Sequence, residues 1–152
     1  MITNYAKQKI LKAMFNLADE SDFGNNTYLG LSLTEPTVDG GNVTEPAAEK
    51  GYVRKLISLY TTSSSTSTME LVNLIKYDNE QQLIRNHQEI HFNEATEAWG
   101  ECAYLCVFDA ATAGNLLSYN QILNESGEPT PISPAPNSVA VLRQDQLTID
   151  ME

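Results

Sequence analysis

The spacing of the apolar residues changes once along this chain of 152 residues, and the change restricts the folds it can adopt. From Ile2 to Ala18 apolar side chains recur every three or four positions, which predicts one amphipathic helix. Thr3 or Asn4 is suited to cap its first turn, and the acidic, glycine-containing stretch at 19–24 is suited to end it. From Thr27 onward the apolar residues come in short runs, mostly with a period of two, which indicates β-strands.

The predicted strands are short and are separated by turn residues. The run 27–33, in which three leucines alternate with Tyr28, Gly30 and Ser32, predicts a strand with one buried face. The almost continuously apolar run 101–108 predicts a central strand, with 116–123 as its hairpin partner. Further strands are predicted at 52–60, 82–85, 89–93, 139–142 and 146–149, and 69–77 fits either a strand or a short helix. Loops are predicted at 38–49, 61–68 and 125–137.

Seven to nine short strands behind a single helix favour a mainly β fold, a β-sandwich or a jelly roll. The length suits one compact domain over 1–152, which we expect to comprise the helix at 1–18 and a β-sandwich at 27–150. The first residues lack the apolar core of a signal peptide. No apolar run approaches the roughly 20 residues that a membrane-spanning helix needs.

The formal net charge of −11, from 20 acidic and 9 basic residues, argues against two classes of partner. Nucleic-acid binders neutralise phosphates with lysine and arginine, and anionic membranes attract basic surfaces. We therefore expect neither nucleic-acid nor membrane binding. The basic cluster of Lys7, Lys9 and Lys12 lies on the predicted helix. It either docks on an acidic neighbour or belongs to a helix that covers one end of the sheet, and the second interpretation is favoured.

His87 and His91, with Glu89 and Glu94 nearby, form the best candidate for a metal site. On a helix, histidines four residues apart share one face, but the order His-Gln-Glu-Ile-His matches no zinc-protease motif. On a strand the two imidazoles would lie about 13 Å apart and could not share an ion. The acidic stretch that begins at Asp19 lacks the ligand spacing of a calcium loop. We expect surface histidines and no metal site.

Cys102 and Cys106 fall within the apolar run 101–108. On a continuous strand both would point to one face about 13 Å apart, whereas a disulfide requires Cα atoms within about 7 Å. Two free, buried thiols fit a reducing cytoplasm, and packing explains them better than nucleophilic chemistry. The sequence contains no phosphate-binding glycine loop, nucleophile elbow or dinucleotide fingerprint. We therefore expect no catalytic residue, no cofactor and no enzymatic activity.

Trp99, next to Gly100, has two interpretations. It could serve as a stacking platform for a sugar ring, with Tyr52, Tyr104 or Tyr119 beside it. A lone tryptophan at the entry to a strand is more often a core anchor, which is the favoured interpretation. Sugar binding remains the second hypothesis.

Several motifs resemble a family of small phage virion proteins that are labelled tail-fibre or Gp80-like proteins. The most specific are the blocks from Phe92 to Gly100 and from Leu105 to Leu117. Others are Asn4-Tyr5-Ala6, Tyr28-Leu29-Gly30-Leu31, Thr34-Glu35-Pro36 and Gly51-Tyr52-Val53-Arg54. The chain departs from the family pattern in 61–87, which is longer and more polar, and in the proline-rich segment 129–136.

The resemblance implies a virion component with an N-terminal helix followed by a β-sandwich, and it supplies no catalytic residues. We expect a non-enzymatic structural or adaptor protein of a phage head or tail, assembled in the bacterial cytoplasm and acting through contacts with other virion proteins. Repeated copies are expected, so a homo-oligomer is predicted. The alternative is a carbohydrate- or receptor-binding module of a phage fibre that recognises a glycan on the host surface.

Overall fold

The computed structural model describes residues 1–17, 26–58 and 73–151. The predictions for the helix end at 19–24, the polar loop at 61–68 and the first part of 69–77 lie outside these residues. The elements are α1 (Asn4–Met14), β1 (Thr27–Ser32), the 3-10 helix η2 (Ala48–Lys50), β2 (Lys55–Ser58), β3 (Ile75–Asp78), β4 (Leu83–Asn86), β5 (Ile90–Glu94), β6 (Tyr104–Phe108), β7 (Leu116–Gln121), β8 (Val139–Leu142) and β9 (Thr148–Ile149). The described helices include none that is long and apolar enough to cross a membrane.

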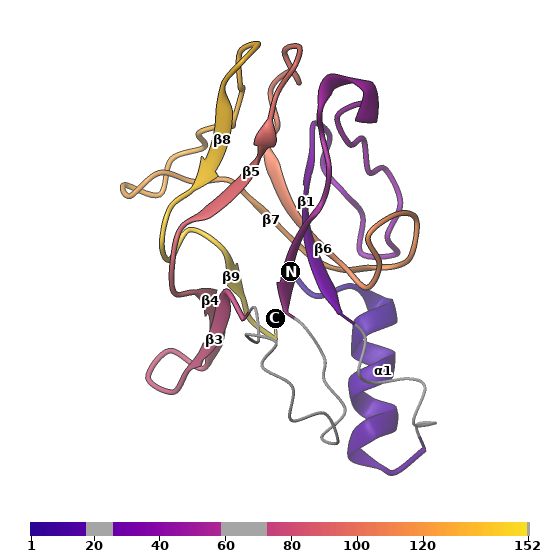
Figure 1. Cartoon of the computed structure of the whole chain (residues 1–152). Helices are drawn as coiled ribbons and strands as arrows, with labels where there is room; N and C mark the ends of the chain where they lie inside the picture. Colours follow the sequence, from indigo (N-terminus) through magenta and orange to yellow (C-terminus); the bar gives the residue numbers. More distant parts are fainter. Residues whose placement is uncertain (18–25, 59–72, 152) are drawn as a thin grey trace, which may run out of the picture.

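The strands form three antiparallel sheets (Figure 1). One has four strands in the order β2-β1-β6-β7, the second has the order β3-β4-β9, and the third is the pair β5-β8. β6 lies inside its sheet, between β1 and its hairpin partner β7, as the sequence predicts. The predicted mainly β fold with one N-terminal helix is thus confirmed, and its sheets are arranged as in a sandwich.

The main core lies between the four-stranded sheet and the other two sheets. Its buried members include Leu29, Leu31, Ile57 and Leu105 on one side and Ile90, Phe92, Leu142 and Leu147 on the other. Alternate residues of β1 and β6 reach this core because successive side chains of a strand point to opposite faces. Each buried leucine or isoleucine stabilises the fold by about 1.5–3 kcal/mol relative to an exposed one.

The outer face of the four-stranded sheet is covered too, so the prediction that 27–33 has only one buried face is wrong. Gly30 and Ser32, which were expected on a solvent face, are both buried. The chain after β1 folds back over this face because Ser32 Oγ accepts a hydrogen bond from Thr44 N (3.0 Å) and donates one to Thr34 O (2.7 Å). A second apolar cluster lies there, made of Cys106, Phe108, Leu116 and Tyr119, with Val43 packed against it.

Residues 1–3 extend the four-stranded sheet by pairing along the free edge of β7. Thr3 N donates to Leu117 O (3.0 Å), and Tyr119 N donates to Met1 O (2.9 Å). Thr3 then caps α1, with its Oγ1 accepting from Ala6 N (3.3 Å), as the sequence predicts. The helix therefore starts from the edge of a sheet more than 110 residues away in the sequence.

The helix is shorter than the predicted 2–18. It ends at Met14, where Phe15 N donates to Leu11 O (3.2 Å) and Asn16 takes a left-handed φ of 59°. Asparagine adopts this conformation more readily than most residues and so ends a helix. In Figure 1 α1 projects beyond the sheets, and none of its residues is fully buried.

The strand predicted at 52–60 begins only at Lys55 in the described residues. Before it, η2 ends at Gly51, whose φ of +84° suits glycine, and the chain then turns so that Tyr52 enters the core. The Tyr52 hydroxyl accepts a hydrogen bond from Leu31 N (2.9 Å). The side chain of Tyr52 thus bonds to the backbone of β1, although Tyr52 is not part of a strand.

Candidate functional site

Four of the motifs that resemble the phage family contribute residues to the outer face of the four-stranded sheet, whereas the block from Phe92 to Gly100 packs in the main core. Arg54 lies against the Phe108 ring, with its guanidinium carbon 3.5 Å from the ring centroid. Its guanidinium also forms a bidentate ion pair with Glu45, in which Nε donates to Oε1 (2.8 Å) and Nη2 donates to Oε2 (2.7 Å). The Arg54 side chain is only 7% exposed, so this pair is largely withdrawn from water.

Arg54 joins two segments that are distant in the sequence. One of its amino groups donates to Ala110 O (2.9 Å) and Ala113 O (2.7 Å) in the turn between β6 and β7. Glu45 Oε1 also accepts from the Tyr52 hydroxyl (2.7 Å), and burial, followed by the Glu45 charge, raises the pKa of Tyr52. These contacts form one buried polar network that fastens the covering loop to the β6–β7 hairpin.

Gly30 permits this network. A Cβ at this position would lie 2.8 Å from both a Phe108 ring carbon and the Tyr52 hydroxyl oxygen, and 3.0 Å from Glu45 Oε1. Such approaches are too close for ordinary contacts. Glycine at this point of Tyr28-Leu29-Gly30-Leu31 is therefore required by space, and the motif has a structural role.

Asp109 organises the turn of the Phe-Asp-Ala block. Its Oδ1 accepts from Asn115 N (2.7 Å), and its Oδ2 accepts from the Asn115 side-chain amide (2.9 Å). The Tyr5 hydroxyl, from α1, donates to Oδ2 as well (3.3 Å). Asn4 fixes the other side of the helix base through its amide, which donates to Asp39 Oδ1 (2.7 Å). The opening Asn-Tyr-Ala motif thus attaches α1 to the sandwich.

Trp99 is a core residue. It is 2% exposed, its Nε1 donates to Lys50 O (2.8 Å), and its ring packs edge-on against Tyr52 (5.3 Å between centroids) and Phe92 (6.2 Å). A ring enclosed in this way has no free face for a sugar. The favoured interpretation as an anchor agrees with this position.

The two histidines do not converge. His87 is half-buried and its Nε2 lies 2.7 Å from Asn73 O, whereas His91 is exposed and contacts Glu89 at 3.2 Å. Within residues 1–17, 26–58 and 73–151, no group of three or more His, Cys, Asp or Glu side chains is placed to hold a metal ion.

The two cysteines are free and buried, but the expectation that they share one face is wrong. Cys102 belongs to the main core and Cys106 to the outer cluster. The reason is that the β6 ladder starts at Tyr104, while Cys102 pairs with Ile132 in the proline-rich segment. Burial raises the pKa of Cys102 to about 11 and that of Cys106 to about 12.

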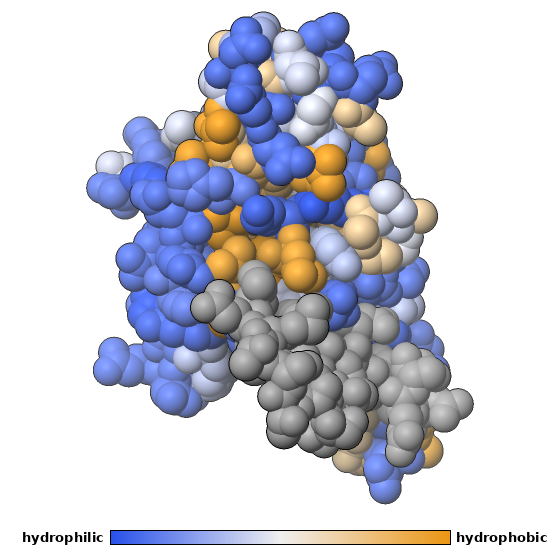
Figure 2. All heavy atoms as spheres, in the orientation of Figure 1, coloured by the Kyte–Doolittle hydropathy of each residue, from blue (hydrophilic) through white to orange (hydrophobic). Residues whose placement is uncertain are grey.

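The far end of α1 carries an exposed apolar surface, which we call the α1 tip. It consists of Leu11, Met14, Phe15 and Leu17, whose exposed fractions are 56%, 72%, 68% and 73%. Hydrophobic atoms are visible at the lower end of the molecule in Figure 2, where α1 lies in Figure 1. Met14 and Leu17 belong to the apolar spacing from which the amphipathic helix was predicted, but both are exposed, because only the first half of α1 lies near the sheet.

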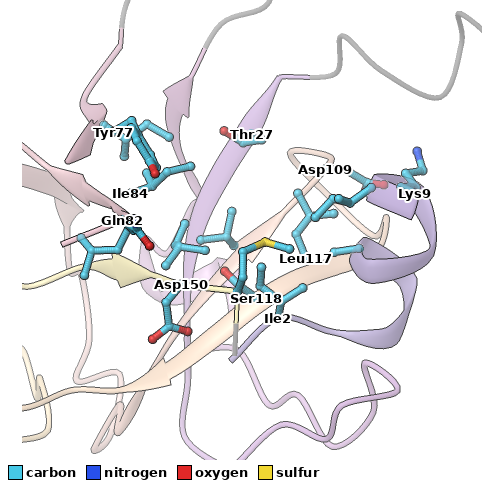
Figure 3. A pocket seen from close by; sticks show the side chains of 17 residues that line it. Ile2, Lys9, Thr27, Tyr77, Gln82, Ile84, Asp109, Leu117, Ser118 and Asp150 are labelled. Carbon is cyan, nitrogen blue, oxygen red and sulfur yellow. The ribbon is translucent and has the colours of Figure 1, made fainter. Parts of the chain in front are cut away.

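An apolar groove lies between the base of α1 and the sheet β3-β4-β9. It has a volume of about 390 Å³, and its apolar lining includes Ile2, Ile10, Ile75, Ile84, Leu117 and Ile149. In Figure 3 Tyr77 and Ile84 lie on one side and Lys9 on the other, with Ser118 between them. Figure 2 shows hydrophobic atoms gathered in the middle of the molecule within a hydrophilic frame. The sequence did not predict this groove.

These features define a mainly β protein whose segments are joined by a buried polar network and which carries two apolar surfaces, the exposed α1 tip and the groove. The chain belongs to the Gp80 family, whose model is described as podophage GP4 fiber I protein gp80 and matches residues 1–129. The predicted family is thus confirmed. The match ends where the proline-rich segment begins. No curated protein matches the chain.

Membership of this family implies a phage fibre protein, which is consistent with a structural component of the virion that contacts other virion proteins. The motif residues that carried the resemblance build the scaffold: Gly30, Tyr52, Arg54 and Asp109 hold elements together.

Proposed function

We propose that this chain is a non-enzymatic structural or adaptor component of a phage fibre, and that it attaches to a neighbouring virion protein through the α1 tip. The observation that carries the proposal is the exposure of four large apolar side chains at the free end of one short helix. Clustered exposed apolar residues of this kind mark interaction surfaces.

The energetics favour a buried state for the tip in the assembled particle. Burial of one such side chain contributes about 1.5–3 kcal/mol, so Phe15 and Met14 alone could supply much of the free energy of a modest contact. Three lysines lie on the same helix, which has no acidic residue. A neighbour with an acidic rim around an apolar recess would suit both features.

The base of α1 is held firmly enough to present the tip in one direction. Thr3 Oγ1 donates to Leu116 O (2.7 Å), and Asn4 N donates to Val38 O (2.9 Å). With the Tyr5–Asp109 contact, these bonds join the first turn of the helix to three parts of the sandwich. Such preorganisation reduces the entropic cost of docking.

The test uses purified phage particles. Mass spectrometry should find the chain in a fixed ratio to the other virion proteins, and cryo-electron microscopy should place it in a fibre. Phe15→Ser and Met14→Ser should lower its incorporation, whereas Val53→Ser, which changes a side chain 53% exposed on another part of the chain, should not. Absence of the chain from particles, or normal incorporation of both tip variants, would contradict the proposal.

The same material tests the carbohydrate- or receptor-binding alternative. Binding to a glycan array, or to the host surface, by a protein whose tip variants still enter particles would favour that alternative. The enclosed Trp99 ring gives no support to a sugar platform at this residue.

A further inference from the structure

We infer that the α1 tip of one copy of this chain docks into the apolar groove of a second copy. The inference rests on the proposed function in taking the α1 tip as the contact element, and it adds the identity of the partner. Each copy carries a protruding apolar surface and a recessed one. Contact between them would remove both from water.

The tip cannot fill the groove of its own chain. Ala6, Lys9 and Ile10, in the first turns of α1, form part of the groove wall. Met14 lies one turn further, about 6 Å along the same rigid axis at 1.5 Å per residue. Leu17 N donates to Lys12 O (2.7 Å), which keeps the residues after Met14 against the helix end. Insertion within one chain would therefore require α1 to unwind.

Charge favours a second copy as the partner. The helix Asn4–Met14 has three lysines and no acidic residue, while the chain as a whole carries −11. All other residues together carry −14, which is −11 less the +3 of the helix. Two acidic side chains, Asp109 and Asp150, and one basic side chain, Lys9, line the groove in the described part of the chain. At contact distance the basic helix of one copy is thus attracted to the acidic body of another, while two whole chains of −11 each repel at longer range, so association should strengthen with moderate salt.

The arrangement is head-to-tail, because the tip and the groove are different surfaces. Contacts of this type leave one tip and one groove free after each step, so copies continue to add until a ring closes or a filament grows. A symmetric pair of tips would leave the apolar groove open to water. The structure therefore points to a repeating assembly in which each copy is both donor and acceptor.

Sedimentation of the purified full chain tests the association. The wild-type protein should associate in a concentration-dependent way. Phe15→Ser on the tip and Tyr77→Ser on the groove should each raise the dissociation constant roughly tenfold to hundredfold, the effect of one buried aromatic side chain. Tyr77 is 57% exposed, so its replacement should leave the fold intact. Val53→Ser is the matched control and should not change the association.

Cross-linking identifies the surfaces in contact. Phe15→Cys in one preparation and Gln82→Cys, at the groove, in another should form a mixed disulfide when the two are combined under oxidising conditions. The native Cys102 and Cys106 are buried and should not react. Val53→Cys mixed with either variant should give no such product. A dominant product joining two Phe15→Cys chains would show a tip-to-tip dimer and overturn the inference.

The two proposals fail in different ways. A wild-type chain that stays monomeric at every concentration, or that associates equally well with Phe15→Ser, overturns self-docking. Such a chain still supports the proposed function if its tip variants are lost from particles.

Discussion

Replacing Arg54 by methionine tests whether the motif residues stabilise this fold by joining distant segments of the chain. The guanidinium makes two hydrogen bonds to Glu45, two to backbone carbonyl groups of the β6–β7 turn, and a stacking contact with Phe108. Methionine retains much of the apolar stem but none of the donors. Glu45, with 24% of its side chain exposed, would be left without its cation.

The expected loss is about 3 kcal/mol. Removal of one partner from a buried ion pair costs about 3–5 kcal/mol, and partial exposure of Glu45 places this pair at the lower end. The matched control is Arg143→Met. Arg143 contacts Glu125 at a similar distance, 2.8 Å against 2.7 Å, but these side chains are 47% and 87% exposed. An exposed pair of this kind contributes about 0–1 kcal/mol.

Urea unfolding followed by tryptophan fluorescence measures both variants, because the single Trp99 lies in the core. The slope of the unfolding free energy with urea should be unchanged, so the midpoints report stability. Combining Arg54→Met with Glu45→Gln should recover part of the loss, since no charge is then left unpaired. If Arg54→Met and Arg143→Met cost the same within 1 kcal/mol, the reasoning from burial is wrong.

Further predictions concern buried groups elsewhere in the fold. Asn86 is fully buried, accepts from Leu147 N (2.9 Å) and donates to two backbone carbonyl groups, so Asn86→Ala should cost about 2–4 kcal/mol in urea unfolding. Asn86→Asp should cost at least as much at pH 7 and less as pH falls, because its carboxylate would face the same two carbonyl oxygens; a penalty independent of pH would contradict this. Iodoacetamide should label Cys102 and Cys106 at pH 8.5 only as fast as the chain unfolds, because their raised pKa values, about 11 and about 12, keep both thiols protonated. Above the ordinary thiol pKa of 9.0 the unfolded chain releases these protons while the folded chain retains them, so stability should fall from pH 9 toward pH 11, and replacing both cysteines by alanine should reduce that fall.

The mainly β architecture was predictable because its signals are local. The change from a period of three or four to a period of two marks where the helix gives way to strands, and the apolar run before Asp109 marks the inner strand. Burial of both faces of β1 was not predictable in this way. It depends on Ser32 and Glu45, polar residues that fasten a loop over the sheet and leave no period in the sequence.

In the candidate site, too, some features could be predicted from local sequence signals and others depend on contacts between distant segments. Motif residues such as Gly30, Tyr52 and Arg54 were singled out by resemblance, but the reason for each, a shared buried network, appears only when three distant segments meet. The groove had no sequence signal because its described lining comes from five places in the chain, around residues 2–10, 27, 75–84, 107–118 and 149–151. The exposed state of Met14 and Phe15 depends on how far the sheet reaches along the helix, which periodicity does not report.

The pairing of residues 1–3 with β7 also sets the order in which the molecule can be completed. Thr3 leaves the ribosome 114 residues before Leu117, the residue whose carbonyl oxygen it bonds. At ordinary synthesis rates this interval is on the order of ten seconds, during which the helix base has no sheet edge to join. A nascent chain halted before residue 116 should therefore lack the β7 contacts of α1, although Val38, Asp39 and Asp109, which also contact the helix base, are already made. Complete attachment of α1 requires a closed β6–β7 hairpin, so a docking surface built on this helix becomes available in its final orientation only after β7 has been made.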